Sequence, residues 1–259
     1  MTGNTFGIDA AGEADRTTEF IRRVIRGASA RGAVVGVSGG VDSAAVGALC
    51  VRALGRTKVL ALLMPSDHTP DQDTRDARTI TKSWGTRTET VPISRIARAL
   101  SGAVKLEGDR LASANVEARV RMTILYYYAN TLGYLVAGTG DKSESLLGYF
   151  TKGGDGNADF FPIAHLYKTQ VRALASYLGV PRGIAEKPAS PQLWPGHKAS
   201  DEIPADYDKL DIVLWHLFDL KSTPVKAAKE AGVPMSVVKR VLEMHRRTEH
   251  KRAPPPSLA

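Results

Sequence analysis

The segment from Ala33 to Ser43 joins an apolar run to a glycine-rich turn and then to a helical pattern. Ala33 to Val37 is apolar, Ser38-Gly39-Gly40-Val41-Asp42-Ser43 follows, and Ala44 to Leu49 continues with small and aliphatic residues. A buried strand that leads through such a turn into a helix is where α/β sheets bind phosphate. The glycines let the backbone approach an anion, and the helix start offers free N–H groups and a positive dipole end. This stretch therefore predicts an α/β protein that binds a phosphorylated ligand.

The turn lacks the G-x-x-x-x-G-K-[ST] spacing and the lysine that serve the β- and γ-phosphates in terminal phosphoryl transfer. We therefore expect a different phosphate chemistry. A carboxylate among phosphates is repulsive unless a cation lies between them, so Asp42 is a candidate magnesium ligand. The alternative is a plain glycine turn in which Asp42 only caps a helix.

Strand and helix patterns alternate through the rest of the N-terminal half. Strands are predicted at residues 58–64, 86–91 and 135–138, and helices at 71–84 and 112–132. This alternation predicts an α/β fold with a single doubly wound parallel sheet flanked by helices, Rossmann-like, whose ligands lie beyond the carboxyl ends of the strands. We expect residues 1–14 to be flexible and residues 15–259 to form one domain with a helical C-terminal extension.

Residues 139–156, after the fourth predicted strand, are the most polar and glycine-rich part of the chain. Ordering such a segment is unfavourable without a partner, and it interleaves Thr, Lys, Glu and Asp with Phe150. We interpret it as one wall of a binding site, with an ordinary surface loop as the alternative.

Basic residues exceed acidic ones, 35 to 27, which gives a net charge of +8. Residues 221–252 hold nine Lys and Arg against three Asp and Glu, so this segment contributes +6 of that excess. A basic segment can meet nucleic acid, a membrane surface or an anionic substrate. Residues 223–241 also predict two short helices around a Gly-Val turn, as in a DNA-binding helix-turn-helix. The alternative is a helix pair that packs on the sheet or on a partner subunit.

A single cysteine, Cys50, excludes an internal disulfide and any CxxC metal or redox site, and we expect it in the core. No run approaches the ~20 apolar residues of a membrane span, and the N-terminus shows no basic-then-apolar targeting pattern. We expect a soluble, cytoplasmic protein without a membrane partner.

Several blocks of the chain resemble, in the same order, those of the ammonia-dependent NAD synthetases, which belong to the N-type ATP pyrophosphatases. The blocks are Ser38–Ser43, Asn115–Met122, Gly138–Glu144, Gly148–Gly156, Leu166–Arg172, Leu193–Gly196 and Glu249–Arg252. The resemblance implies a ligase that uses ATP and Mg²⁺ to adenylate the nicotinate carboxylate of deamido-NAD, then amidates it with ammonia, releasing AMP and pyrophosphate. It also implies a homodimer with substrate sites at its interface. Because the chain has no room for a glutaminase domain, we expect free ammonia or a glutaminase in trans.

Carried over residue by residue, the resemblance assigns a role to each matching position. It implies ATP contacts at Ser38, Gly39, Gly40, Asp42, Ser43, Thr139 and Lys187. It implies deamido-NAD contacts at Asn115, Arg119, Phe150, Lys152, Asp155 and Lys251. Asp42 and Glu144 resemble the magnesium pair, and the catalytic candidates are Asp42, Glu144, Lys152 and Lys187.

One block departs from the family. His197-Lys198-Ala199-Ser200 stands where the family usually has Gln-Thr-Asp-Glu, in a loop that commonly closes over the bound nucleotides. The loss of two acidic residues leaves open a related pyrophosphate-loop amide ligase or adenylating enzyme that acts on a different carboxylate. DNA binding through the basic helix pair is the alternative from another class, and the least expected.

Overall fold

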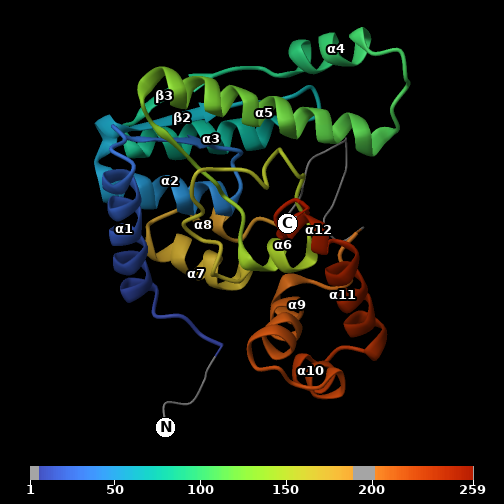
Figure 1. Cartoon of the computed structure of the whole chain (residues 1–259). Coiled ribbons are helices and arrows are strands. Elements are labelled where there is room, and N and C mark those ends of the chain that lie inside the picture. Colours follow the sequence, from blue (N-terminus) through green and yellow to red (C-terminus); the bar gives the residue numbers. More distant parts are fainter. Residues whose placement is uncertain (1–5, 189–201, 259) are drawn as a thin grey trace.

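The computed structural model describes residues 6–188 and 202–258, which form a parallel sheet with helices on both faces (Figure 1). The strands are β1 (Ala33–Gly36), β2 (Val59–Leu63), β3 (Arg87–Thr90) and β4 (Leu135–Ala137). They lie in the order β3-β2-β1-β4, and every neighbouring pair is parallel. The predicted strands and the doubly wound α/β fold are therefore confirmed.

Side chains of the two central strands alternate between two apolar cores, because successive residues of a strand point to opposite faces. Val35 and Ala61 belong to the core under one face, and Val34 and Leu60 to the core under the other. The first face is covered by α1 (Ala10–Gly27), α2 (Val41–Leu54), α3 (Asp71–Trp84), α7 (Lys168–Tyr177) and α8 (Arg182–Ala185). The second is covered by α5 (Arg110–Leu132), and α4 (Ser94–Ala103) packs against α5; the two helices lie together at the top of Figure 1. Cys50 is fully buried on α2, as expected.

The C-terminal helices form a third apolar core beside the sheet. They are α9 (Tyr207–Leu214), the π-helical turn η3 (Trp215–Asp219), α10 (Pro224–Ala231) and α11 (Met235–Arg247). α12 (Glu249–Arg252) follows them and has no buried residue. Leu147 of α6 (Lys142–Leu147) packs into this core with Leu210 and Val241. The predicted helical extension is thus confirmed. The pair α10–α11 buries Ala228, Ala231, Val238 and Val241 in this core, which agrees with the alternative of a packed helix pair.

The N-terminal residues are more structured than the sequence indicated. α1 begins at Ala10, where Asp9 caps it by accepting a hydrogen bond from the Gly12 N–H at 3.2 Å. Ala14 is fully buried, and the ring of Phe6 lies 5.4 Å from those of Tyr167 and Trp215. Residues 6–14 thus make specific contacts, and the division into residues 1–14 and one domain at 15–259 stays a prediction. None of the helices in the described part of the chain has the length and apolar character to span a bilayer.

Candidate active site

The strand order places two of the predicted site segments next to each other. β2 and β3 follow β1 on one side and β4 lies on the other, so the strand order switches sides between the parallel strands β1 and β4. At such a switch point, the segments that follow the two neighbouring strands run to opposite faces of the sheet. The crevice between them, at the carboxyl ends of the strands, is where α/β proteins bind ligands. The Ser38–Ser43 turn follows β1, and the segment with Thr139 and Glu144 follows β4.

The turn after β1 is ordered by its own serines. Ser43 Oγ donates to the Gly40 carbonyl at 3.0 Å and accepts from the Ser38 N–H at 3.2 Å. Gly40 in turn donates its N–H to Ser38 Oγ at 3.2 Å. The turn is therefore shaped before any ligand arrives, and the first N–H groups of α2 have no carbonyl partner within the helix. This is the arrangement that binds phosphate oxygens.

Gly39 allows a close approach between the turn and α3. Its φ is +85°, and a Cβ at this position would lie 2.3 Å from the Asp73 carbonyl oxygen. Lys187 Nζ donates to the Gly39 carbonyl at 3.1 Å and to Asp73 Oδ1 at 2.7 Å, and it also pairs with Asp76. Burial alone would lower the pKa of Lys187, but the two aspartates raise it. Lys187 is therefore a cation beside the turn, as its predicted role requires.

Lys168 stands among three carboxylates in the crevice. Its Nζ lies 2.7 Å from Asp42 Oδ2, 2.9 Å from Asp141 Oδ2 and 2.7 Å from Glu144 Oε1. Asp141 starts α6 through a capping box, in which it accepts from the Glu144 N–H at 2.8 Å and donates its own N–H to Glu144 Oε2 at 3.4 Å. The predicted magnesium pair, Asp42 and Glu144, is thus brought together, with a third carboxylate and a lysine between them.

The cluster carries more negative than positive charge. Three carboxylates share one ammonium group, and the side chains of Asp141 and Lys168 are 0% and 1% exposed. Burial raises the pKa of Asp141 to about 6 and that of Glu144 to about 8. Burial alone would lower the pKa of Lys168, but Asp141, Asp42 and Glu144 raise it well above its ordinary value. Further positive charge would be stabilised here.

The donor set fits a magnesium ion that arrives with phosphates. Asp42 Oδ1 is buried and has no hydrogen-bond partner within the described residues, which is unfavourable unless a cation or water meets it. Residues 6–188 and 202–258 contain no group of three or more His, Cys, Asp or Glu arranged as a ready metal cage. Mg²⁺ usually takes one or two carboxylates and completes its shell with water and phosphate oxygens. Asp42 and Glu144 meet that requirement.

One buried carboxylate of α9 positions both helices that carry the cluster. Asp211, 0% exposed, accepts from Ser143 Oγ at 2.6 Å and from both the N–H and Oγ1 of Thr169 at 2.8 Å. Ser143 Oγ also accepts from the Lys168 N–H at 3.0 Å. Asp211 therefore holds the first turns of α6 and α7, where Glu144 and Lys168 lie.

The six predicted deamido-NAD residues gather around residues 148–156. Thr151 donates its Oγ1–H to Asn115 Oδ1 at 2.7 Å and its N–H to Asp155 Oδ1 at 2.8 Å. Arg119 Nε donates to the Lys152 carbonyl at 3.3 Å. The N-terminal half of α5 thus supports this segment, which we call the substrate wall.

Helix α12 closes the substrate wall from the other side. Lys251 Nζ donates to the carbonyls of Gly148 at 2.8 Å and Phe150 at 2.6 Å, and it lies 5.3 Å from the centre of the Phe150 ring. Lys152 Nζ donates to the His250 carbonyl at 3.0 Å. Lys152 therefore lies in the wall rather than in the carboxylate cluster. The wall meets one end of α6 and the cluster the other, about 9 Å apart for six helical residues.

The matching family model, described as NAD synthase, covers residues 13–255. The chain belongs to the NAD synthase family. The NH(3)-dependent NAD(+) synthetase of Hyperthermus butylicus is 51% identical over 251 residues, 96% of this chain and 91% of that protein. That of Methanocaldococcus jannaschii is 41% identical over 246 residues, 94% of this chain and 95% of that protein.

Two solved structures of related enzymes have the same fold. An NMN synthetase from Francisella tularensis matches with a TM-score of 0.87 and 30% identity, covering 97% of this chain and 99% of that one. An NH3-dependent NAD synthetase from Campylobacter jejuni matches with a TM-score of 0.84 and 28% identity, covering 98% and 100% of the two chains.

Three residues of the site, Asp141, Lys168 and Asp211, were not predicted from the sequence. Asp141 had a local signal, because Asp141-Lys142-Ser143-Glu144 has the spacing of a capping box. Lys168 lies in the Leu166–Arg172 block but was given no role, because its partner Asp42 is 126 residues away. Asp211 had no signal, since its partner Ser143 lies 68 residues away. Thr139 is half-buried between β4 and α6, beside the crevice as predicted. The altered block His197 to Ser200 lies outside the described residues, so its effect stays a prediction.

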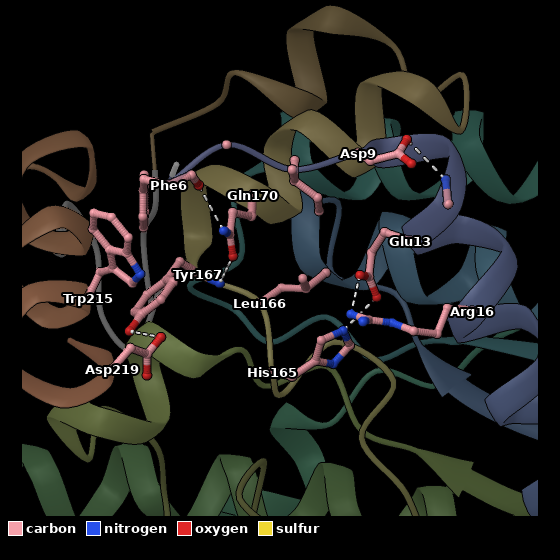
Figure 2. Close-up of a pocket in the computed structure, with 13 residues that line it drawn as sticks. Phe6, Asp9, Glu13, Arg16, His165, Leu166, Tyr167, Gln170, Trp215 and Asp219 are labelled. Carbon is pink, nitrogen blue, oxygen red and sulfur yellow. Dashed lines mark hydrogen bonds and ion pairs between the residues drawn. The ribbon is translucent and has the colours of Figure 1, made fainter. Parts of the chain in front are cut away.

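A separate pocket lies beside the start of α7, and none of the predicted site residues line it (Figure 2). Phe6, Tyr167 and Trp215 lie at one end of it, and Glu13 and His165 at the other. Gln170, on α7, donates to the Phe6 carbonyl and accepts from the Tyr167 N–H, each at 3.0 Å. These contacts anchor the residue before Lys168, so the pocket region supports the site without forming it.

We expect Asp211→Asn to impair the use of ATP more than that of the second substrate. The change keeps size but weakens the hydrogen bonds that place Lys168 and Glu144. Steady-state kinetics should show kcat/KM for ATP falling roughly 10-fold or more, with the KM of the other substrate little changed. Asp208→Asn is the matched control, on the same helix with a 78% exposed side chain. Equal losses for both substrates, in step with a lower Tm, would mean that Asp211 only stabilises the fold.

Proposed function

We propose that this chain is an ammonia-dependent NAD synthetase, an ATP-dependent ligase that converts deamido-NAD, ATP and ammonia to NAD, AMP and pyrophosphate. The observation that carries the proposal is the meeting of Asp42 and Glu144 with Lys168 at the crevice between β1 and β4, one α6 length from the substrate wall. A metal–ATP site and a second anion site at that separation suit a reaction in which the carboxylate of one nucleotide attacks the α-phosphorus of the other. The ammonia comes from solution or from a separate glutaminase, and the reaction takes place in the cytoplasm.

The triphosphate would lie over the N-terminus of α2. The Ser38–Ser43 turn offers backbone N–H groups to the phosphates. Lys168, at the start of α7, and Lys187, two residues after the end of α8, supply positive charge. Asp42 and Glu144 would hold Mg²⁺, which when bound offsets negative charge on the phosphate oxygens. The two lysines stabilise the pyrophosphate that leaves when the α-phosphorus is attacked.

The nicotinate carboxylate is a poor electrophile for ammonia, so it must first be activated. Its oxygen attacks the α-phosphorus of ATP, pyrophosphate leaves, and an acyl adenylate forms. Ammonia then attacks the acyl carbon and AMP departs with the carboxylate oxygen. The protein contributes mainly by positioning the two nucleotides and by offsetting charge.

The substrate wall suits a dinucleotide. Arg119, Lys152 and Lys251 bring three cations to it, which would face the pyrophosphate of deamido-NAD. The Phe150 ring can stack on a heterocycle, and Asn115 and Asp155 flank it with polar groups. These contacts favour deamido-NAD as the acid.

A second candidate is the amidation of nicotinic acid mononucleotide. The likeness to the NMN synthetase of Francisella tularensis favours it, because that chain aligns over 97% of this one. The mononucleotide lacks the adenylate half of deamido-NAD and would leave part of the basic wall unused. Comparing kcat/KM for the two acids decides between the candidates, and we expect deamido-NAD to be preferred.

A homodimer is the expected assembly. The surface of α4, α5 and the segment between them exposes the large apolar side chains Ile96, Leu100, Val104, Leu106, Leu111 and Tyr127, each between 45% and 84% exposed. Apolar patches of this kind on one face mark protein interfaces. A second copy of the chain would cover the patch and bring two α5 helices, which carry Asn115 and Arg119, near each other.

We expect the purified protein with ATP, Mg²⁺, ammonium and deamido-NAD to form NAD, AMP and pyrophosphate in equal amounts. Liquid chromatography with mass detection measures all three. Asp42→Asn should lower kcat roughly 100-fold or more, because it removes the charge that a Mg²⁺ ligand requires. Asp15→Asn, at a 72% exposed position on α1, should stay near the native rate. Stoichiometric ADP, or an active Asp42→Asn variant, would contradict the assignment.

Lys251→Met should weaken the binding of deamido-NAD selectively. The variant removes an ammonium that both fixes the Phe150 carbonyl and faces the dinucleotide, so KM for deamido-NAD should rise about 10-fold with KM for ATP unchanged within about twofold. Initial-rate measurements with each substrate varied provide the test. Lys239→Met, exposed on α11, is the control. An equal rise in both KM values would show that Lys251 serves packing alone.

The double variant Ile96→Asp with Leu100→Asp should be monomeric. Two carboxylates in an apolar contact are strongly unfavourable there but are tolerated on a solvated helix. Light scattering coupled to size exclusion gives the mass. Val225→Asp, at a 69% exposed apolar position on α10, should leave the assembly intact. A native protein that is already monomeric at micromolar concentration would refute the interface.

A further inference from the structure

Three carboxylates from two separate segments converge on one ammonium group. Asp42 comes from the turn after β1, and Asp141 and Glu144 from the start of α6, all within 2.9 Å of Lys168 Nζ. The ammonium donates hydrogen bonds to Asp42 Oδ2 and Glu144 Oε1, and Asp141 Oδ2 forms an ion pair with it at 2.9 Å. The Tyr207 ring lies 5.4 Å from Nζ.

The cluster is not balanced as a purely structural ion pair would be. Buried ion pairs are retained when charges match and the remaining oxygens are hydrogen-bonded. Here one ammonium group faces three carboxyl groups, and Asp42 Oδ1 is buried without a partner in the described residues. The arrangement has the form of a cation site filled by the protein's own cation.

We propose that Lys168 is the resident cation of the Asp42–Asp141–Glu144 cluster in the nucleotide-free protein and keeps free divalent metal out of it. The ammonium occupies the region that a metal bound to Asp42 and Glu144 would enter. Metal alone must displace it from three carboxylates, with no anion nearby to receive it. A metal–nucleotide complex supplies both a cation for the carboxylates and phosphate oxygens for Lys168.

Metal and nucleotide would then bind with positive cooperativity. A ligand shifts an equilibrium only by its difference in affinity for the two states, and each of these ligands favours the state in which Lys168 has left the cluster. The coupling is reciprocal. Free Mg²⁺ at cellular concentration would leave the site unfilled, and the metal would enter with ATP. This part rests on the proposed function, while the occupancy of the cluster by Lys168 does not.

Asp141 has a distinct part in this device. Its Oδ1 accepts the N–H of Glu144 as the helix cap, and its Oδ2 faces Lys168. It is 1% exposed overall, so a solvated metal ion cannot reach it as it reaches Asp42. We assign it to holding the ammonium, and it is a further carboxylate beyond the magnesium pair.

The test is the binding of Mn²⁺ to the nucleotide-free protein, followed by electron paramagnetic resonance, with Tm measured in EDTA and in Mg²⁺. Wild type should bind Mn²⁺ weakly, and its Tm should not respond to Mg²⁺. Lys168→Met should bind Mn²⁺ roughly 10-fold tighter or more. In EDTA its Tm should fall by about 10 °C, because the buried Asp141 and the half-buried Asp42 and Glu144 lose their cation, and Mg²⁺ should restore part of the loss.

Lys142→Met is the matched control. Lys142 also pairs with a carboxylate, Asp219, at 2.6 Å, but outside the cluster. Its replacement should leave Mn²⁺ affinity as in wild type. Equal Mn²⁺ affinities in wild type and Lys168→Met would overturn the proposal, and so would tight Mn²⁺ binding by wild type without nucleotide.

If Lys168→Met does not fold, a double variant still tests the proposal. Lys168→Met with Asp141→Asn removes one negative charge with the positive one, so the charge of the cluster returns to its wild-type value. Its Tm in EDTA should lie above that of Lys168→Met, or it should fold where the single variant does not. A double variant no more stable than the single one would contradict the assignment of Asp141. Because no turnover is measured, failure of the proposed synthetase activity would not affect these results.

Discussion

The burial of Lys168 among Asp42, Asp141 and Glu144 is the interaction on which the site depends. Like charges held this close in a buried crevice repel strongly, so the fold must hold them from several directions. The adjacency of β1 and β4 brings the two acidic segments together, and the capping box of α6 fixes Asp141 and Glu144. Asp211 sets the start of α7, from which Lys168 enters. Removing any one of these supports would leave charges without their partners.

The C-terminal helices are part of the site rather than an appendage. α9 supplies Asp211 at one end of α6. At the other end, Lys251 of α12 donates a hydrogen bond to the Gly148 carbonyl. Arg252 of α12 donates to the carbonyls of Ser145 and Leu146. A short helix of six residues has little stability of its own, so it needs both attachments. The third apolar core therefore sets the distance between the carboxylate cluster and the substrate wall.

Periodic patterns explain which parts of the fold were predictable. The strands and the helix at 71–84 were predicted because their apolar residues repeat locally and the turns between them are polar. The carboxylate and wall residues came from contiguous blocks that resemble a family. Lys168 lies in one of these blocks, but its place in the cluster could not be predicted, because it contacts Asp42 across 126 residues. Asp211 lies outside the blocks and contacts Ser143 across 68 residues. Residues 6–14 were expected to be flexible because they contain few apolar residues, and Phe6 and Ala14 find their partners only in the folded chain.

The positions of the charged side chains, rather than the net charge of the chain, determine which ligands are favoured at the site. Arg252 donates hydrogen bonds to backbone carbonyls, whereas Lys239 and Arg240 are exposed to solvent. The net charge of +6 in residues 221–252 is therefore not concentrated at one ligand site. What matters is the contrast along α6. Carboxylates gather at its first turn, and Arg119, Lys152 and Lys251 lie beyond its last turn. A polyanion that carries a metal is favoured at the acidic end, and one without a metal at the basic end. Opposite charges at the two ends of one short helix can thus direct two similar nucleotides to different places.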